Sequence, residues 1–287
     1  MMAFTSGLLH AQSFDLQGHR GCRGWMPENT VAAMIHGLKM GATTLELDVV
    51  VSKDSVVVVS HDPYMNADFT LQPDGSVFSK EIEKEFVLFE MTYSEIASWD
   101  VGMKPHPKFP QQQRLPARKP RLEDLIDSID AYARLTGRLL PRYNIETKSR
   151  PAGDGKLHPP PADFVHLLMD VISRKGIAER VTIQSFDRRT LLTLHQSHPN
   201  IQTSILVDAS DRSSLEMQIN ALGFVPSVYS PAWQLVTPEL VQSCHIKGMR
   251  IIPWTVNERM DIERFHAMGV DGVITDYPEP SLLKKRP

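Results

Sequence analysis

The chain has 287 residues, is 41% hydrophobic and carries a formal net charge of -3. Its length allows a sizeable core, in one large α/β barrel or in two small domains. The small net charge argues against a broad basic surface for nucleic acid or an anionic membrane, and no run reaches the ~18 apolar residues of a membrane span. Cys22 and Cys244 are far apart in the sequence and form no metal or disulfide motif, so we interpret both as structural.

Residues 1–11 are mostly small or apolar. They are similar to the tail of a secretory signal peptide that lacks its basic front, and the alternative is a disordered N-terminus. We therefore expect one folded domain over residues 12–287. The signal-like start slightly favours export over a cytoplasmic location.

Nine segments have the composition of β-strands, and helical patterns such as residues 164–176 and 188–199 lie between many of them. Several are continuous runs rich in valine and isoleucine, as expected for parallel strands that are covered on both faces. The nine segments are residues 14–19, 43–50, 56–61, 142–148, 181–186, 201–207, 227–232, 249–256 and 271–276.

This alternation predicts an α/β fold, and the absence of a GxGxxG fingerprint favours a TIM (β/α)8 barrel over an open doubly wound sheet. A barrel needs eight strands, so one of the nine candidates is in excess. The close pair at 43–50 and 56–61, which no helix separates, is where the strand count is in question.

The segment from residue 64 to residue 121 is polar and spotted with prolines, and it interrupts the barrel pattern. It is too long for an ordinary barrel loop, so we interpret it as an inserted subdomain or lid over one end of the barrel. A second polar loop, residues 149–163, follows another strand. Long loops after strands concentrate on the face of a barrel that carries enzyme sites.

Histidines at strand ends are the first candidates for chemistry. His19 and Arg20 end a strand in a glycine-rich turn, where a guanidinium and free backbone amides can hold an anion, and Gly21 gives the backbone room to approach it. The PENT motif that follows, residues 27–30, predicts a helix start. His61 ends another strand, and the unperturbed pKa of histidine, ~6.5, suits His19 and His61 to general acid-base catalysis.

Three carboxylates stand in otherwise apolar strands. Glu46 and Asp48 are two residues apart and project to the same side of a strand, and Glu146 has the same spacing from Lys148. Together the carboxylates offer hard oxygen ligands to Mg²⁺ or Ca²⁺, whereas zinc is disfavoured because carboxylates outnumber histidines. The alternative is a salt-bridge network with Arg20 and Lys148, since buried carboxylates are costly unless they are paired or bound to a cation.

A cation, two basic side chains and two histidines together suggest phosphoryl transfer. The metal and Arg20 would offset charge on the phosphate oxygens, while the histidines would serve the nucleophile and the departing alkoxide.

The motifs HRG, PENT, ELDV, HD, NIETK, PWTVN and GVDGVITDYP, in this order over residues 19–278, resemble the glycerophosphodiester phosphodiesterase family. The resemblance implies a TIM barrel in which residues 64–121 are the insertion. It also implies metal-dependent hydrolysis of a small glycerophosphodiester to sn-glycerol 3-phosphate and an alcohol such as choline or ethanolamine.

The same resemblance assigns roles to individual residues. It makes His19 and His61 the acid-base pair, without deciding which begins as the base, and it places the divalent ion on the three carboxylates named above. Arg20 would bind phosphate and stabilise the transition state, and Lys148 would contact phosphate. Trp254 would help to wall the pocket, with a core tryptophan as the alternative.

Two other functions are alternatives to a glycerophosphodiester phosphodiesterase. Barrel lipases of the phosphatidylinositol phospholipase C or sphingomyelinase D type resemble the same barrel and share a histidine pair, but no exposed aromatic or basic docking helix is evident outside the insertion. A binding protein without turnover does not need two titrating histidines. Residues 144–164 resemble exported members of the phosphodiesterase family, which favours a periplasmic or secreted location, with the cytoplasm as the alternative.

Overall fold

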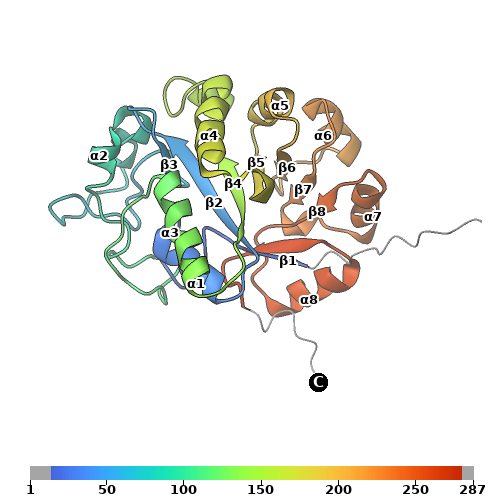
Figure 1. Ribbon diagram of the computed structural model, residues 1–287, viewed down its shortest axis with the longest axis horizontal. Helices are drawn as coiled ribbons and strands as arrows, with labels where there is room; N and C mark the ends of the chain where they lie inside the picture. The colour runs from blue at the N-terminus through green and yellow to red at the C-terminus, as the bar shows by residue number, and fades with distance from the viewer. Residues whose placement is uncertain (1–13, 280–287) are drawn as a thin grey trace, which may run out of the picture.

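Parallel strands surrounded by helices make up most of the computed structural model, which describes residues 14–279 (Figure 1). The parallel strands are β1 (Asp15–Gly18), β2 (Thr44–Val51), β4 (Arg142–Thr147), β5 (Val181–Ser185), β6 (Gln202–Val207), β7 (Val228–Pro231), β8 (Arg250–Ile251) and β9 (Gly272–Thr275). The helices between them are α1 (Val31–Lys39), α3 (Leu122–Leu135), α4 (Pro161–Lys175), α5 (Arg188–Ser197), α6 (Leu215–Leu222), α7 (Pro238–Ile246) and α8 (Arg259–Met268).

The strands follow the spatial order β8-β7-β6-β5-β4-β2-β1-β9. Backbone hydrogen bonds complete the circle between β8 and β9, because the amide of Asp271 donates to Ile251 at 3.0 Å and that of Ile274 donates to Pro253 at 2.9 Å. The predicted TIM barrel is therefore confirmed.

Of the nine predicted strands, the one that lies outside the barrel is the segment at 56–61, which forms β3 (Val57–Val59). It pairs antiparallel with the end of β2, with Val51 opposite Val57. A connection of five residues between the two strands is too short for a parallel crossover, so a hairpin is the arrangement that it permits. The pair in which the strand count was in question thus contains the strand that the barrel does not use.

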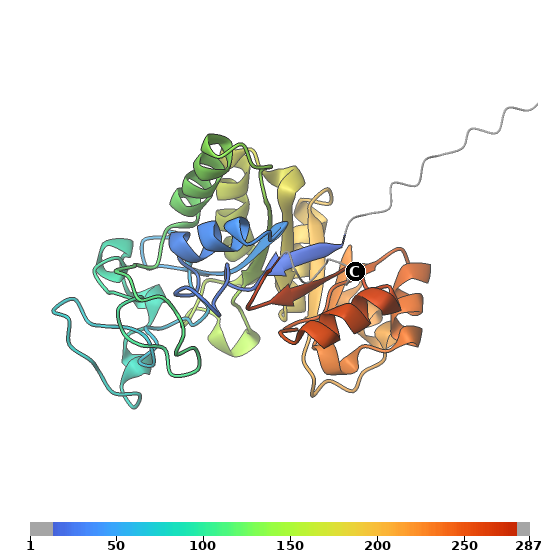
Figure 2. The same ribbon diagram turned by 90° about the horizontal axis from the view of Figure 1, so that it is seen from below.

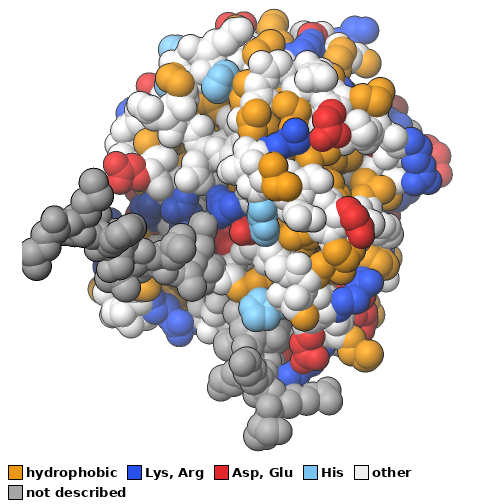
Figure 3. All heavy atoms as spheres, turned by 90° about the vertical axis from the view of Figure 1, so that its right-hand side faces the viewer, with side chains coloured by type: hydrophobic (Ala, Val, Ile, Leu, Met, Phe, Trp, Pro, Cys, Tyr) orange, Lys and Arg blue, Asp and Glu red, His pale blue; other side chains and the backbone are white. Residues whose placement is uncertain are grey.

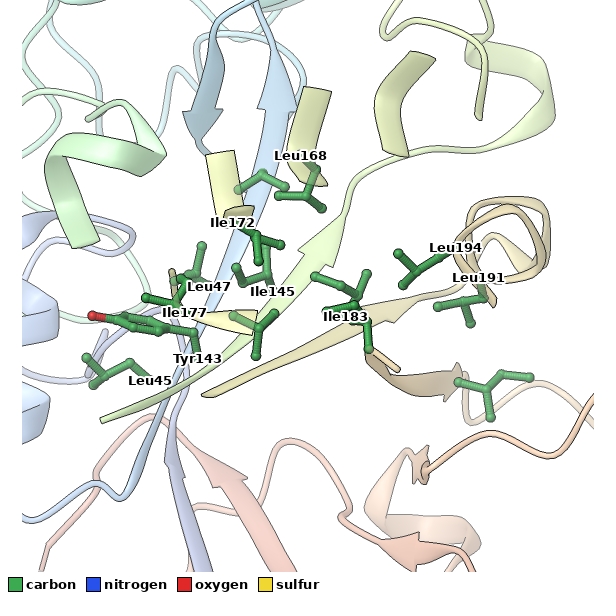
Figure 4. Close-up of a cluster of buried hydrophobic side chains, with 14 of the residues drawn as sticks. Leu45, Leu47, Tyr143, Ile145, Leu168, Ile172, Ile177, Ile183, Leu191 and Leu194 are labelled. Carbon is green, nitrogen blue, oxygen red and sulfur yellow. The ribbon is translucent and has the colours of Figure 1, made fainter. Parts of the chain in front are cut away.

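Side chains alternate between the two faces of the barrel strands, and on β2, β4 and β5 the apolar ones pack against the surrounding helices (Figure 4). The main hydrophobic core consequently lies between the barrel and the helices, where it removes apolar surface from water. On β2, β4 and β5 and the helices that cover them, the buried members include Leu45, Leu47, Tyr143, Ile145, Ile183, Leu168, Ile172, Leu191 and Leu194.

On β1, β2, β4 and β5 the side chains inside the barrel are polar, and several of them are hydrogen-bonded to one another. The Asn144 amide donates to Gln17 at 2.8 Å and to Gln184 at 3.0 Å, and the Gln184 amide donates in turn to Glu46 at 2.8 Å. Buried amides are costly unless they are hydrogen-bonded, so this chain of amides fixes side-chain orientation inside the barrel. It ends at one of the three predicted metal-ligand carboxylates.

The segment 64–121 lies beside the barrel next to β3, as Figure 2 also shows. It contains α2 (Tyr93–Ile96) and two single 3₁₀ turns (Glu83–Glu85 and Leu88–Glu90). A small apolar cluster joins it to the hairpin; its buried members are Val50, Val58, Met65, Ala67, Phe78, Leu88, Tyr93, Ile96 and Trp99. The division of the chain into a barrel and an insertion remains our interpretation.

The cysteines, the helix lengths and the surface charges bear on the remaining expectations. Cys22 and Cys244 are both buried and free, in agreement with a structural role. Among residues 14–279, no helix has the length and hydrophobicity to cross a bilayer. On the face over α6, α7 and α8, acidic and basic side chains are interspersed with apolar ones (Figure 3). Residues 1–11, interpreted as signal-like, lie outside the described residues.

Candidate active site

The loops that follow the barrel strands enclose a pocket of about 150 Å³. Of the eight residues predicted for the site, only Asp48 is not among its lining residues, and its carboxylate lies within 4.8 Å of those of Glu46 and Glu146, which do line it. The carboxyl ends of parallel strands meet at one end of a barrel, which brings these distant residues together. The seven that line the pocket are His19, Arg20, Glu46, His61, Glu146, Lys148 and Trp254.

A larger groove of about 590 Å³ lies elsewhere, between α1, α3 and residues 113–120. Its lining includes none of the eight predicted residues. Size therefore does not identify the chemical site in this molecule, whereas the gathering of ionisable groups does.

The turn after β1 is strained in a way that serves the site. Arg20 has a φ of 48°, and its backbone amide donates to the Glu46 carboxylate at 2.7 Å. Gly21 has a φ of 89°, and a Cβ atom there would lie 2.6 Å from the carbonyl carbon of Ala33 in α1. The contact with α1 is a second reason for glycine at this position, beside the predicted approach of the backbone to an anion, which stays a prediction.

His19 is held by a carboxylate at its Nδ1 atom. This atom lies 2.7 Å from Oδ1 of Asp276, which also accepts from Arg23 Nε at 2.6 Å. Burial lowers the pKa of His19, the positive charge of Arg23 lowers it further, and Asp276 opposes both, with a result of about 4. Because His19 is then neutral near pH 7 and its Nδ1–H donates to Asp276, its Nε2 lone pair is free to accept a proton.

His61 has the same kind of support. Its Nδ1 atom lies 3.1 Å from Oδ1 of Asp62, whose other oxygen accepts from Asn66 at 2.7 Å. Burial would raise the pKa of Asp62, but the hydrogen bond and charge of His61 outweigh it and lower that pKa. The His61 side chain is 32% exposed, against 13% for His19. Each histidine therefore has a carboxylate on Nδ1 and keeps Nε2 for other chemistry.

The carboxylates of Glu46, Asp48 and Glu146 are buried and lie within 4.8 Å of one another. The ion pairs that were the alternative to a metal are partly present, since Lys148 lies 2.7 Å from Glu146 and 3.6 Å from Asp48, and Arg20 Nε lies 3.4 Å from Asp48. Glu46 forms no ion pair with any residue in the range 14–279. The basic side chains therefore leave one buried carboxylate that is held by hydrogen bonds from the Arg20 amide and Gln184 and not by an ion pair.

The pKa values of the three carboxyl groups reflect their burial and the uneven distribution of the neighbouring positive charges. Burial raises the pKa of Glu46 well above its usual value, and the neighbouring charge of Asp48 adds to the effect. Burial also raises the pKa of Glu146, although Lys148 opposes it. Burial would raise the pKa of Asp48, but Lys148, His61 and Arg20 outweigh it and lower that pKa. An excess of buried oxygen ligands with mutual repulsion fits a hard divalent cation.

The model of the glycerophosphoryl diester phosphodiesterase family matches residues 19–280. The chain belongs to this family. Membership makes it a phosphoric diester hydrolase, as the resemblance of its motifs implied.

Two relatives named glycerophosphodiester phosphodiesterase support the assignment. The one from Caldanaerobacter subterraneus subsp. tengcongensis is 31% identical over 263 residues, which cover 91% of this chain and 93% of the relative. The one from Bacillus subtilis is 30% identical over 284 residues, which cover 96% of this chain and 88% of the relative.

Solved structures have the same fold. A Silicibacter pomeroyi protein assigned as a glycerophosphoryl diester phosphodiesterase is 33% identical, with a TM-score of 0.82 over 94% of this chain and 92% of that one. A phosphodiesterase from Oleispira antarctica, solved in complex with the product sn-glycerol-3-phosphate, is 20% identical, with a TM-score of 0.72 over 92% and 93% of the two chains.

The phosphodiesterase PENT motif does more than start a helix. Thr30 caps α1 by accepting from the amide of Ala33 at 3.1 Å, in agreement with the predicted helix start. Asn29 instead turns toward the site, where its amide donates to Asp48 at 2.9 Å and its oxygen accepts from the Asp48 backbone at 3.2 Å. Glu28 accepts from Arg20 Nη1 at 2.7 Å. Sequence reasoning missed both contacts because capping alone explained the motif.

Two further residues of the candidate site were missed although the sequence carried a signal for each. Asp276 directly follows β9, so the strand-end criterion that selected His19 and His61 also applies to it. Gln184 projects into the barrel from β5 opposite Glu146 in the strand register, and it donates to Glu46. Polar residues that point into the barrel from neighbouring strands are therefore candidates for hydrogen bonds to the predicted ligand carboxylates.

Proposed function

We propose that this chain hydrolyses glycerophosphodiesters to sn-glycerol 3-phosphate and an alcohol, with a divalent metal ion and two histidines as general acid and base. The observation that carries the proposal is the single pocket in which two carboxylate-supported histidines face two basic side chains and a buried acidic cluster. This combination suits an anionic substrate with a poor leaving group.

Glu46, Asp48 and Glu146 would hold Mg²⁺ or Ca²⁺. When bound there, the ion supplies positive charge to the phosphate oxygens as a Lewis acid. Arg20 and Lys148 are partly buried beside the same carboxylates and would bind the remaining phosphate oxygens. Glu28 keeps the Arg20 guanidinium in place through its bond to Nη1.

The two pockets at this end of the barrel support different roles for the two histidines. His19 lines the catalytic pocket with Trp254 and Arg20, whereas His61 also lines a second, adjoining pocket of about 380 Å³. A diester has the glycerol on one side of phosphorus and the alcohol on the other. We assign His19, whose ring is neutral and whose Nε2 atom carries no proton, as the base on the glycerol side. We assign His61 as the acid on the alcohol side.

In the first step, His19 Nε2 takes the proton of the attacking hydroxyl, which belongs either to the substrate glycerol or to water. The oxygen forms a bond to phosphorus while the bond from phosphorus to the alcohol oxygen breaks, and its electron pair stays on that oxygen. His61 donates a proton to the departing oxygen. After attack by glycerol, water opens the cyclic phosphate with the two histidines in reversed roles.

Trp254 is placed to shape the glycerol side of the pocket. Its indole N–H donates to the carbonyl oxygen of Ser230 at 2.9 Å, and its ring contacts Phe186 edge-on at a centroid distance of 5.6 Å. A fixed aromatic face at the pocket can pack against the glycerol carbon atoms. We therefore assign it to the pocket wall.

The nature of the product is supported by the complex of the Oleispira antarctica phosphodiesterase with sn-glycerol-3-phosphate. The test is to identify the products from glycerophosphoglycerol and glycerophosphocholine by ³¹P NMR and an enzymatic assay for sn-glycerol 3-phosphate. The proposal predicts sn-glycerol 3-phosphate with free alcohol. Phosphocholine with free glycerol, or activity on micellar phospholipid alone, would contradict it.

We also propose export from the cytoplasm. Residues 1–11 and the resemblance of residues 144–164 to exported members of the family support this location. Fractionation of cells that express the full chain tests it, since the proposal predicts a protein in the periplasm or medium that is shortened at its N-terminus.

A further inference from the structure

The second pocket of about 380 Å³ continues directly from the catalytic pocket. The two share His61, Glu146, Lys148 and Phe186 as lining residues, but His19 lines the catalytic pocket alone. The second pocket therefore starts at the acid and leads away from the base. A group that leaves phosphorus on the His61 side would lie in it.

The outer wall of this pocket is held in place by its own contacts. It is formed by the loop after β4, in which Asp154 accepts from the Arg189 guanidinium at 2.7 and 3.0 Å. Arg189 is fixed in turn by Asp187 at 2.7 Å. The buried His158 ring accepts from the Arg150 backbone amide at 3.1 Å. A wall with these contacts is formed before any ligand arrives, which lowers the entropic cost of binding.

The charges that line the second pocket leave one cation uncompensated. Asp62 and Glu146 are already engaged with His61 and Lys148. The exposed side chain of Arg150 forms no ion pair or hydrogen bond within residues 14–279. A ligand in this pocket would therefore meet an available guanidinium.

Burial raises the pKa of the Tyr64 phenol and the negative charges of Asp62 and Glu83 raise it further, while Lys80 and Arg150 oppose them. Tyr64 and Arg150 both line the second pocket. A guanidinium and a phenol together offer donors to hydroxyl, carboxylate or phosphate oxygens, and the guanidinium repels an ammonium group.

We propose that the second pocket binds the alcohol part of the diester, and that Arg150 makes it select neutral polyols and alcohols with an anionic group over ammonium alcohols. This inference rests on the proposed function, because the phosphate must occupy the catalytic pocket. A volume of about 380 Å³ is within the range of small-molecule sites. Choline and ethanolamine, the head groups expected from the family resemblance, are repelled by the guanidinium and are the poorer substrates.

The test compares kcat/KM for four diesters with neutral or cationic alcohols: glycerophosphoglycerol, glycerophosphoinositol, glycerophosphocholine and glycerophosphoethanolamine. The ratio of neutral to cationic substrates is measured for the wild type, for Arg150→Ala and for Arg150→Glu. An exposed charge pair changes binding by up to about fivefold, so the neutral substrates should lead by about that factor in the wild type. Arg150→Glu should shift the ratio by about tenfold toward the cationic substrates, because it reverses the charge.

Arg264→Glu is the matched control, since it makes the same charge change on an exposed side chain of α8 outside both pockets. It should leave the substrate ratio unchanged. An equal ratio in the wild type and Arg150→Glu, or an equal shift in Arg264→Glu, would overturn the inference. If none of the four diesters is hydrolysed, the proposed function itself fails, and the alcohol pocket fails with it.

Discussion

At the scale of single residues, His19 shows how the surroundings of a side chain decide its role. Burial and the charge of Arg23 lower its pKa to about 4 in spite of Asp276, so it is neutral well below pH 7. A neutral base loses activity when it becomes protonated. We therefore predict that the acidic limb of kcat/KM falls near pH 4 and not near the ~6.5 of an unperturbed histidine.

The variant Arg23→Gln tests the cause of this shift, because it removes the positive charge that lies beside the ring. The acidic limb should move to higher pH, while Arg264→Gln on α8 should leave it in place. Circular dichroism over the same range shows whether the chain remains folded. An acidic limb of kcat/KM that lies near pH 6.5 and does not move in Arg23→Gln would exclude His19 as the base.

Substitution of each histidine separates the base from the acid. Both His19→Gln and His61→Gln should lower kcat/KM for a natural diester by about 10²- to 10⁴-fold, the usual contribution of a proton-transfer group. A diester with a nitrophenyl leaving group needs no acid, so it should restore much of the rate in His61→Gln and little in His19→Gln. The exposed His166→Gln on α4 is the control and should be unaffected. Rescue of His19→Gln alone would reverse our assignment.

At the scale of elements, the start of α1 combines a helix cap with support for the acidic cluster. Thr30→Ala removes the cap and should lower the free energy of unfolding by about 1 kcal/mol without changing metal affinity. Asn29→Ala removes a donor from the buried Asp48 and should weaken metal binding as well as stability. Isothermal titration with Mg²⁺ or Ca²⁺ and thermal unfolding measure the two effects.

Asn29 has a φ of 56°, so alanine also adds backbone strain at that position. Asn29→Gly removes the same side chain without this strain and serves as the second variant. Equal metal affinities in Asn29→Gly and Thr30→Ala would mean that Asn29 does not support the site.

The elements also show what the sequence could predict. Strand ends and two-residue spacing were enough to select His19, Glu46 and Glu146, because period-two alternation is local and the barrel brings all carboxyl strand ends together. The partners of these groups depend on long-range register. The inward position of Gln184 on β5 can be read from the sequence, but its partner Glu46 cannot, because that contact depends on how β5, β4 and β2 are aligned.

At the scale of the whole molecule, the acidic cluster should couple stability to pH and to metal. In the ion-free protein the pKa values of Glu46 and Glu146 are raised, so between the ordinary and the raised values the folded state binds more protons than the unfolded state. Stability should therefore fall as pH rises through this interval. A divalent ion displaces those protons, so its affinity should rise with pH.

Thermal unfolding with and without millimolar Mg²⁺ or Ca²⁺, at pH 5.0 and pH 7.5, measures this coupling. Ligand at 100 times its Kd adds about 2.7 kcal/mol to the free energy of unfolding. The increase in Tm should be larger at pH 7.5 and should be absent in Glu46→Gln. An increase that is independent of pH and persists in that variant would place the ion elsewhere.

The most direct test of the account is turnover of glycerophosphoglycerol by protein stripped of metal and then refilled. The account predicts that chelated wild-type protein loses nearly all production of sn-glycerol 3-phosphate and regains it with Mg²⁺ or Ca²⁺, whereas Glu46→Gln remains folded and is not restored at the same ion concentrations. Full activity of the chelated wild type, or full restoration of Glu46→Gln, would contradict it.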